Sequence, residues 1–240
     1  MNNAYEEQFL IRFSEGNRHA KLKLRAFFDY AQQVAAHHAE IIGVGFDALR
    51  QQNQVWLLAR IKMQFEEFPE IDQTIRVQTY PAGFDRLFAI REYRFLTQDG
   101  TMLAKGTSNW LLVDTEKQRI LPPQREYGSL LPKFDNLEIA FPLLDKLPQT
   151  MENTTASDQY KIRDTMVDIN NHLNNAEYAA IVQNCIGVGK YPRTLQLNYQ
   201  NAVPENEILN VQAQIDDQGF HVIGTFEDKQ AFQATGTFMP

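Results

Sequence analysis

Apolar residues recur at helical spacing from Leu22 to Leu49, after a predicted strand at residues 8–13. This spacing predicts one long helix with a single apolar face, which Gly43 and Gly45 are expected to end or loosen. Gln98-Asp99-Gly100 is typical of a hairpin turn, because glycine tolerates positive φ. Four strand-like stretches follow the helix, the last two joined by that turn: Val55–Phe65, Thr74–Pro81, Leu87–Thr97 and Met102–Val113.

The same order of elements returns in the second half of the chain. A short predicted strand at Tyr160–Arg163 precedes a helical pattern at Leu173–Gly187. Between the halves, Ile120–Thr155 contains five prolines and no sustained period, which indicates a linker or covering segment. Four further strands are predicted after the second helix: Thr194–Tyr199, Glu207–Ile215, Phe220–Phe226 and Ala231–Phe238.

Short sequence matches in a common order support a duplication. Glu15-x-Asn17-x-His19 resembles Asp168-x-Asn170-x-His172, 153 positions later (15 to 168). Two further matches have smaller offsets, of 135 and 130 positions: Phe68-Pro69-Glu70 with Val203-Pro204-Glu205, and Ala104-Lys105-Gly106-Thr107 with Ala234-Thr235-Gly236-Thr237.

A long helix followed by about four antiparallel strands favours a sheet that wraps around the helix. We therefore predict an α+β fold, a double hotdog with two tandem hotdog copies, each a long helix wrapped by an antiparallel sheet. The predicted divisions are an N-terminal hotdog at 1–119, a linker or covering segment at 120–157 and a C-terminal hotdog at 158–240. The alternative is an unrelated α+β protein whose strand patterns coincide by chance.

The composition is that of an ordinary soluble globular protein, with 43% hydrophobic and 22% charged residues among 240. The formal charge of −7 disfavours nucleic-acid binding, which requires a basic surface. No run of about 18 apolar residues exists, so no membrane span is expected. A single cysteine, Cys185, excludes an intramolecular disulfide, and the N-terminus resembles neither a signal nor a transit peptide. The sequence thus predicts a cytoplasmic protein.

Most familiar catalytic and cofactor motifs are missing, including the phosphate loop, the G-x-S-x-G elbow and H-E-x-x-H. Gly43-x-Gly45 lacks the third glycine of a dinucleotide-binding turn. His37 and His38 are adjacent and would point about 100° apart on a helix, so they are expected at the helix surface or boundary. Cys185 is expected to be a small buried hydrophobe rather than a nucleophile. We predict no cofactor and no metal.

One polar cluster precedes the second helix, in the segment Asp168–Tyr178. Its Asn and Asp residues favour a loop that leads into a helix N-cap, and the first helical turn would offer unpaired N–H groups to a developing oxyanion. In an extended stretch, Asp168, Asn170 and His172 would point to one side and could activate water against a carbonyl. The alternative is a loop whose polar groups only cap the helix.

The pattern Asp168-x-Asn170-x-His172-x-Asn174-Asn175-x-x-Tyr178 resembles the motif of acyl-acyl carrier protein (acyl-ACP) thioesterases of plant plastids and bacteria. The resemblance covers nearly the whole chain and implies a double hotdog that releases a fatty acid from fatty acyl-ACP. It also implies that Asp168, Asn170 and His172 are the catalytic residues. The shorter core of the motif resembles single-hotdog acyl-CoA thioesterases as well.

The family pattern also has a glutamate in a Tyr-x-x-Glu run, where this chain has Tyr199-Gln200-Asn201-Ala202. Three interpretations of the missing acid stay open: Asp168 is the only base, Glu205 or Glu207 acts from a shifted turn, or the chain hydrolyses its substrate slowly. The alternatives to acyl-ACP hydrolysis are an acyl-CoA thioesterase, a non-catalytic acyl- or carrier-binding module, and thioester hydration or dehydration. Glu15-x-Asn17-x-His19 is interpreted as a remnant of a second site.

The expected partner is acyl carrier protein with its fatty acyl thioester, and the oligomeric state stays open, a homodimer being one option. Because carrier proteins are acidic, docking would need local basic residues on a chain of charge −7. The candidates are Arg86, Arg91, Arg94 and Lys105, or Lys190 and Arg193. The acyl chain is expected between helix and sheet, under residues such as Phe27, Phe28, Ala31, Val34 and Trp56.

Overall fold

A computed structural model describes residues 4–130, 138–142 and 144–240 of the chain. The strands of the first half are β1 (Tyr5–Leu10), β2 (Gln54–Phe65), β3 (Thr74–Asp85), β4 (Phe88–Leu96), β5 (Met102–Asp114) and β6 (Arg119–Leu121). Those of the second half are β7 (Ala156–Lys161), β8 (Pro192–Tyr199), β9 (Ile208–Ile215), β10 (Gly219–Phe226) and β11 (Lys229–Phe238).

All eleven strands of the described residues belong to one antiparallel sheet, in the order β1-β3-β4-β5-β2-β8-β11-β10-β9-β7, with β6 paired to β5. The first half therefore runs β1-β3-β4-β5-β2, and the second half runs β7-β9-β10-β11-β8 towards it. The halves meet where β2 pairs with β8, from Arg60 opposite Asn198 to Gln64 opposite Thr194. This repeated order confirms the predicted double hotdog, while the boundaries predicted at 119 and 157 stay a prediction.

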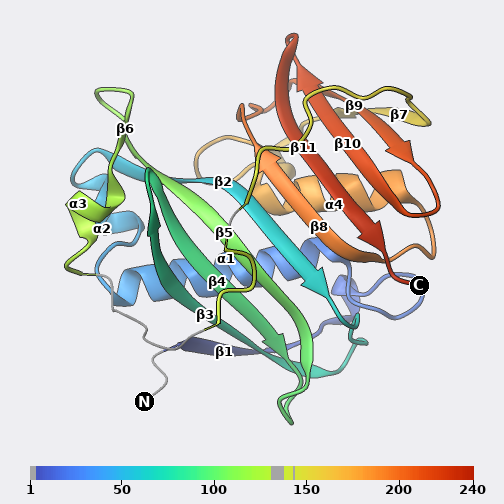
Figure 1. Cartoon of the computed structure of the whole chain (residues 1–240), viewed down its shortest axis with the longest axis horizontal. Coiled ribbons are helices and arrows are strands. Elements are labelled where there is room, and N and C mark those ends of the chain that lie inside the picture. The colour runs from blue at the N-terminus through green and yellow to red at the C-terminus, as the bar shows by residue number, and fades with distance from the viewer. Residues whose placement is uncertain (1–3, 131–137, 143) are drawn as a thin grey trace.

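The helices α1 (Leu24–Ile41) and α4 (Asn175–Ile186) lie on one side of the sheet, behind the strands in Figure 1. The long helix predicted to Leu49 ends earlier, because Gly43 adopts a φ of 77°. A short helix, α2 (Phe46–Arg50), then begins after Gly45. No described helix combines the length and the apolar character needed to cross a bilayer.

The first strand lies about three residues earlier than predicted. In β1, Tyr5 pairs with Thr79 and Leu10 with Thr74 of β3. Ile11 then turns into the core, where it is fully buried, and Phe13 lies in a 3-10 turn with 83% of its surface exposed. Local apolar residues do not reveal which of them a turn will expose.

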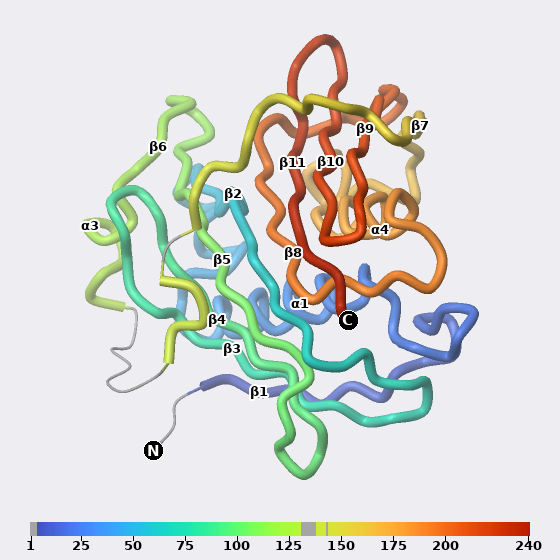
Figure 2. Tube along the Cα trace, turned by 45° about the vertical axis from the view of Figure 1, so that its right-hand side comes forward, coloured from blue at the N-terminus to red at the C-terminus, as the bar shows by residue number. Residues whose placement is uncertain are grey.

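The described parts of residues 138–149 cross the face of the sheet opposite the helices, as the yellow segment in Figures 1 and 2 shows. Strand side chains hold this segment by its backbone: Gln196 Nε2 donates to the Asp145 carbonyl (2.8 Å), and Gln233 Nε2 donates to the Pro148 carbonyl (2.7 Å). Glu92 Oε2 accepts from the Ala140 N–H (2.8 Å). The region predicted to lack regular elements also contains β6 and a short helix, α3 (Pro123–Tyr127).

The main hydrophobic core fills the space between the two long helices and the sheet. Four of the expected tunnel residues are buried in it: Phe27, Phe28, Ala31 and Val34. The fifth, Trp56, lies instead in a separate cluster with Tyr127, and its Nε1 donates to the Val44 carbonyl (3.0 Å). The expectation that Trp56 shares a tunnel with the α1 residues is therefore wrong, because α2 and α3 form a second small core around it.

Candidate active site

Asp168 closes a tight loop in front of α4. The Asp168 N–H donates to the His172 carbonyl (2.9 Å), and the Asn171 N–H donates to the Asp168 carbonyl (3.0 Å). Asn171 has a φ of 59°, which asparagine adopts more readily than most residues. The loop is fixed to the sheet side by an isolated bridge between His172 and Pro204. The segment is thus a turn, not the extended stretch predicted from its alternation.

The loop brings two of the three predicted catalytic side chains together. Asp168 Oδ1 accepts from the Asn170 N–H (2.8 Å), and Asp168 Oδ2 accepts from Asn170 Nδ2 (3.3 Å). Asp168 is half-buried and Asn170 is exposed. Among the described residues, no hydrogen bond or ion pair joins the half-buried His172 imidazole to either side chain. The turn at Asn171 explains this separation, since it ends the alternation between Asn170 and His172.

Asn174 caps the first turn of α4, as an Asn-rich loop before a helix favours. Its Oδ1 accepts from the Ala176 N–H (2.9 Å), and its carbonyl accepts from the Glu177 N–H (2.9 Å). Two of the N–H groups expected to be free for an oxyanion are therefore already bonded. A thioester oxygen would have to use other donors of this loop or displace the cap.

Tyr178, the last residue of the motif, is buried behind the loop. Its ring makes edge contacts with Tyr199 (centroids 5.3 Å apart) and Phe232 (5.0 Å). Burial raises the pKa of Tyr178, and the negative charge of Asp168 raises it further. The Tyr178 hydroxyl therefore stays protonated within electrostatic reach of the Asp168 carboxylate.

Ala202, at the position of the family glutamate, is exposed and directly follows the bend at Asn201 after β8. Glu205 is exposed and Glu207 is half-buried, on either side of Asn206, which has a φ of 70°. No described contact joins either glutamate to Asp168. The part of the chain that the structure describes thus offers no second carboxylate bonded to the candidate base.

The first half contains a loop with the same backbone hydrogen bonds. The Asn17 N–H donates to the Lys21 carbonyl (2.7 Å), and the Ala20 N–H donates to the Asn17 carbonyl (3.0 Å). Asn17 Oδ1 accepts from the His19 N–H (2.8 Å), and Ala20 has a φ of 58°. These bonds repeat those of Asp168, Asn171 and His172 one by one.

The repeat therefore has a different register from the one predicted. Asn17 is equivalent to Asp168 and Lys21 to His172, both 151 positions apart, whereas the sequence match had placed Glu15 opposite Asp168 at 153. The first loop consequently has an amide where the second has a carboxylate, which supports its interpretation as a remnant. The other offsets change too, to 134 and 128: Pro69 with Val203, which accept from Leu22 and Leu173, and Gly106 with Ala234, which pair with Met63 and Leu197.

His37 and His38 lie in different environments, and Cys185 carries a protonated thiol. His37 lies at the surface, 2.7 Å from Glu7, as predicted, but His38 is buried and stacks on Tyr5. Burial and the charge of Arg91 lower the pKa of His38 to about 4. Burial raises the pKa of Cys185 to about 11, so its thiol is protonated. Within the described ranges, no group of three His, Cys, Asp or Glu side chains could hold a metal ion.

The basic residues proposed for carrier docking differ in exposure. Arg91 is buried, with its Nη1 3.1 Å from His38 Nδ1, so the expectation that it docks a carrier is wrong. Arg94 and Lys105 lie 4.0 and 3.5 Å from Glu138. Arg193 pairs with Glu66 at 2.6 Å, while Arg86 and Lys190 are exposed.

Comparisons with known families give two matches that together span most of the chain. Residues 2–130 match the model of the acyl-ACP thioesterase N-terminal domain, and residues 149–235 match that of the acyl-ACP thioesterase C-terminal domain. A comparison with curated proteins gives no match.

Solved structures with the same fold include three long matches. A putative oleoyl thioesterase from Lactobacillus plantarum is 20% identical, with a TM-score of 0.87 over 100% of this chain and 98% of its own. An acyl-ACP thioesterase from Bacteroides thetaiotaomicron is 18% identical, with a TM-score of 0.85 over 99% and 98%. A 12:0-ACP thioesterase from Umbellularia californica is 18% identical, with a TM-score of 0.86 over 99% and 97%.

Proposed function

This chain belongs to the acyl-ACP thioesterase family, and we propose that it releases a fatty acid from fatty acyl-ACP by attack of water on the thioester carbonyl, with Asp168 as the base. The chain is a thioester hydrolase of fatty acid metabolism. The observation that carries the catalytic assignment is the contact between the half-buried Asp168 carboxylate and the exposed Asn170, in the loop in front of α4.

In the proposed reaction, Asp168 takes a proton from water while the water oxygen forms a bond to the thioester carbon. The carbon–sulfur bond then breaks, and the proton passes from Asp168 to the leaving thiolate, which gives a free fatty acid and a carrier thiol. Asn170 has its amide on Asp168 Oδ2, so it holds the carboxylate in place. His172 is assigned by the family motif, to orient the carbonyl or the water.

The missing glutamate argues for a reaction in which Asp168 acts alone. Ala202 occupies its place, and neither Glu205 nor Glu207 contacts Asp168 in the described residues. A positioned acid–base group typically contributes 10²–10⁴-fold, so turnover should be measurable but slower than that of a homologue with the glutamate.

The carrier protein, rather than coenzyme A, is proposed as the natural thiol, and a cytoplasmic site of action is proposed with it. Support comes from the family models and, for the location, from the single cysteine, Cys185. With Arg91 buried, the exposed Arg86 and Lys190 are the candidates left to meet an acidic carrier. If docking is electrostatic, KM should rise steeply with salt.

The test is hydrolysis of matched fatty acyl-ACP and acyl-CoA thioesters of varied chain length, with the products identified. We expect free fatty acid from the carrier thioesters, at a kcat/KM well above that for the CoA thioesters. A higher kcat/KM for acyl-CoA, with no salt dependence, would favour the acyl-CoA thioesterase alternative. If neither thioester releases fatty acid faster than buffer alone, the non-catalytic binding module is the remaining alternative. An enoyl product would indicate dehydration.

A further inference from the structure

The first-half loop lines a cavity of about 830 Å³. Its walls are residues 14–19, the start of α1, the end of α4 and the segment 187–191. A smaller cavity of about 250 Å³ lies elsewhere, against Glu92 and Glu138, and neither cavity is lined by Asp168, Asn170 or His172. Since the two loops share their hydrogen bonds, the larger cavity lies against the first-half counterpart of the Asp168 loop.

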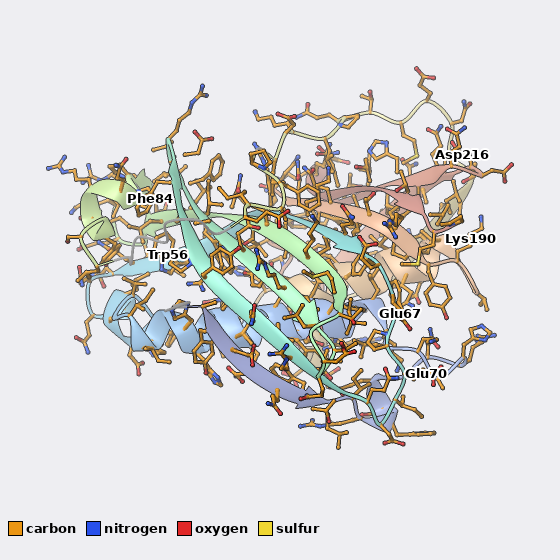
Figure 3. The ribbon with its side chains drawn as sticks, turned by 60° about the horizontal axis from the view of Figure 1, so that its bottom comes forward. Trp56, Glu67, Glu70, Phe84, Lys190 and Asp216 are labelled. Carbon is orange, nitrogen blue, oxygen red and sulfur yellow. The ribbon has the colours of Figure 1, made fainter. Side chains whose placement is uncertain are left out.

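Positive charge collects on this cavity although the whole chain carries a charge of −7. Both lining carboxylates are already bonded: Glu15 accepts from the Tyr30 hydroxyl (2.7 Å), and Asp29 lies 3.2 Å from Arg25. Arg25 also pairs with Glu177 at 2.6 Å, outside the lining. The remaining lining cations are exposed and join no ion pair of the described residues: Arg18, Lys23 and Lys190. Figure 3 places Lys190 at the edge of the molecule, at the same end as Asp216.

Neutral polar groups complete the lining. Asn17 Nδ2 donates to the Tyr191 hydroxyl (3.2 Å), and Gln183 and Asn184 also line this space. Gln183 Oε1 accepts from the Leu24 N–H (3.0 Å), while the Asn184 side chain is bonded to Tyr160. Gly187 and Gly189 have positive φ and no atom within 4 Å of the place of a Cβ, so this wall is open. The cavity thus offers cations at its exposed rim and amide and hydroxyl partners beside them.

We infer that this cavity binds, without cleaving, a phosphopantetheine arm, the phosphate- and amide-bearing group that acyl carrier proteins and coenzyme A share. Arg18 and Lys23 would pair with the phosphate, and the Gln183 Nε2 group would donate to an amide carbonyl of the arm. Asn17 replaces the aspartate of the other loop, and an amide cannot act as a base. The lining carboxylates, Glu15 and Asp29, are already bonded, so the bound thioester stays intact. The identity of the arm, though not the presence of an anion site, rests on the proposed function.

The test is calorimetric titration of the full chain with coenzyme A. We expect two sites, and in the Arg18→Glu, Lys23→Glu double variant one of them should weaken by about tenfold or more, with kcat on acyl-ACP unchanged. The matched control is Arg119→Glu, Lys229→Glu, which reverses two exposed cations elsewhere and should retain both sites. Binding that the cavity variant leaves as it was, or a single site in the parent, would overturn the inference.

Further arms identify the ligand. Pantetheine without phosphate should lose the second site, and carrier protein with its arm should compete for that site while the carrier without its arm should not. Equal competition by the carrier without its arm would show that the cavity binds an acidic protein surface, and it would refute the phosphopantetheine arm as the ligand. A parent that fails to hydrolyse acyl-ACP but keeps two coenzyme A sites would refute the proposed function alone.

Discussion

Replacing Asp168 with asparagine removes the proposed base and keeps the shape of its loop. The first half shows that an amide can fill this place, since Asn17 Oδ1 accepts from the N–H groups of His19 (2.8 Å) and Lys21 (3.1 Å). In Asp168→Asn the remaining oxygen can keep the bond to the Asn170 N–H. The substitution therefore separates chemistry from folding.

The substitution should have a small effect on stability and a large effect on kcat. The one bond at risk joins Asp168 Oδ2 to Asn170 Nδ2 at 3.3 Å, beside an exposed side chain, so its loss should cost about 1 kcal/mol or less of stability. Loss of a general base typically lowers kcat by about 10²–10⁴-fold, which corresponds to about 3–5 kcal/mol in the barrier.

The assay is the initial rate of fatty acid release from saturating acyl-ACP, together with the thermal midpoint of each protein. Asp216→Asn is the matched control, because Asp216 Oδ1 likewise caps a turn by accepting from the Gln218 (2.8 Å) and Gly219 (2.9 Å) N–H groups. It should leave kcat unchanged. An Asp168→Asn protein that keeps more than a third of the parental kcat would refute Asp168 as the base.

Three further predictions follow from other sites. Ala202 is exposed, so Ala202→Glu should fold and raise kcat by about tenfold if a second carboxylate assists; an unchanged kcat in a protein of the same thermal midpoint would show that this bend cannot aim a carboxylate at the substrate. Burial raises the pKa of Glu92 to about 7, so the folded state holds a proton that the unfolded chain releases near pH 4.5. The free energy of unfolding should accordingly fall by up to about 3 kcal/mol as pH rises from 4.5 to 7. Urea titrations should show no such pH dependence for Glu92→Gln, and an equal pH dependence in both proteins would contradict the assignment to Glu92. A Cβ at Gly106 would overlap Met63 Sδ, so Gly106→Ala should destabilise the fold by about 1–3 kcal/mol in urea, and an unchanged midpoint would mean that Met63 moves aside freely.

The sequence predicted the long elements because each packs one face against a shared core. In α1, the helical spacing of Phe27, Ala31 and Val34 follows from their burial under the sheet, and that burial is visible in a hydrophobic pattern. The hydrophobic pattern gave the wrong prediction for His38, which was expected at the helix surface or boundary. A polar residue can lie on the buried face when it has a partner such as Arg91, which is distant in the sequence. Element ends were also missed, as for β1, where pairing to β3 decides which residues are extended.

The candidate site could be located from the sequence but not assembled from it. The density of Asn and Asp before α4 correctly predicted a loop with an N-cap. The arrangement of the side chains depends on the left-handed backbone of Asn171, which turns the chain between Asn170 and His172. The register of the repeat was hidden for a related reason: Asn17 and Asp168 cap their loops in the same way, although their residue types differ.

The seam between β2 and β8 makes each half depend on the other. Five residue pairs join the two strands there. A chain cut between β6 and β7 would therefore give two fragments, each with an unpaired edge strand. The two fragments should reassociate when mixed, and either fragment made alone should form a homodimer through its exposed strand. The join thus keeps within one polypeptide a contact through which two separate halves would otherwise have to assemble.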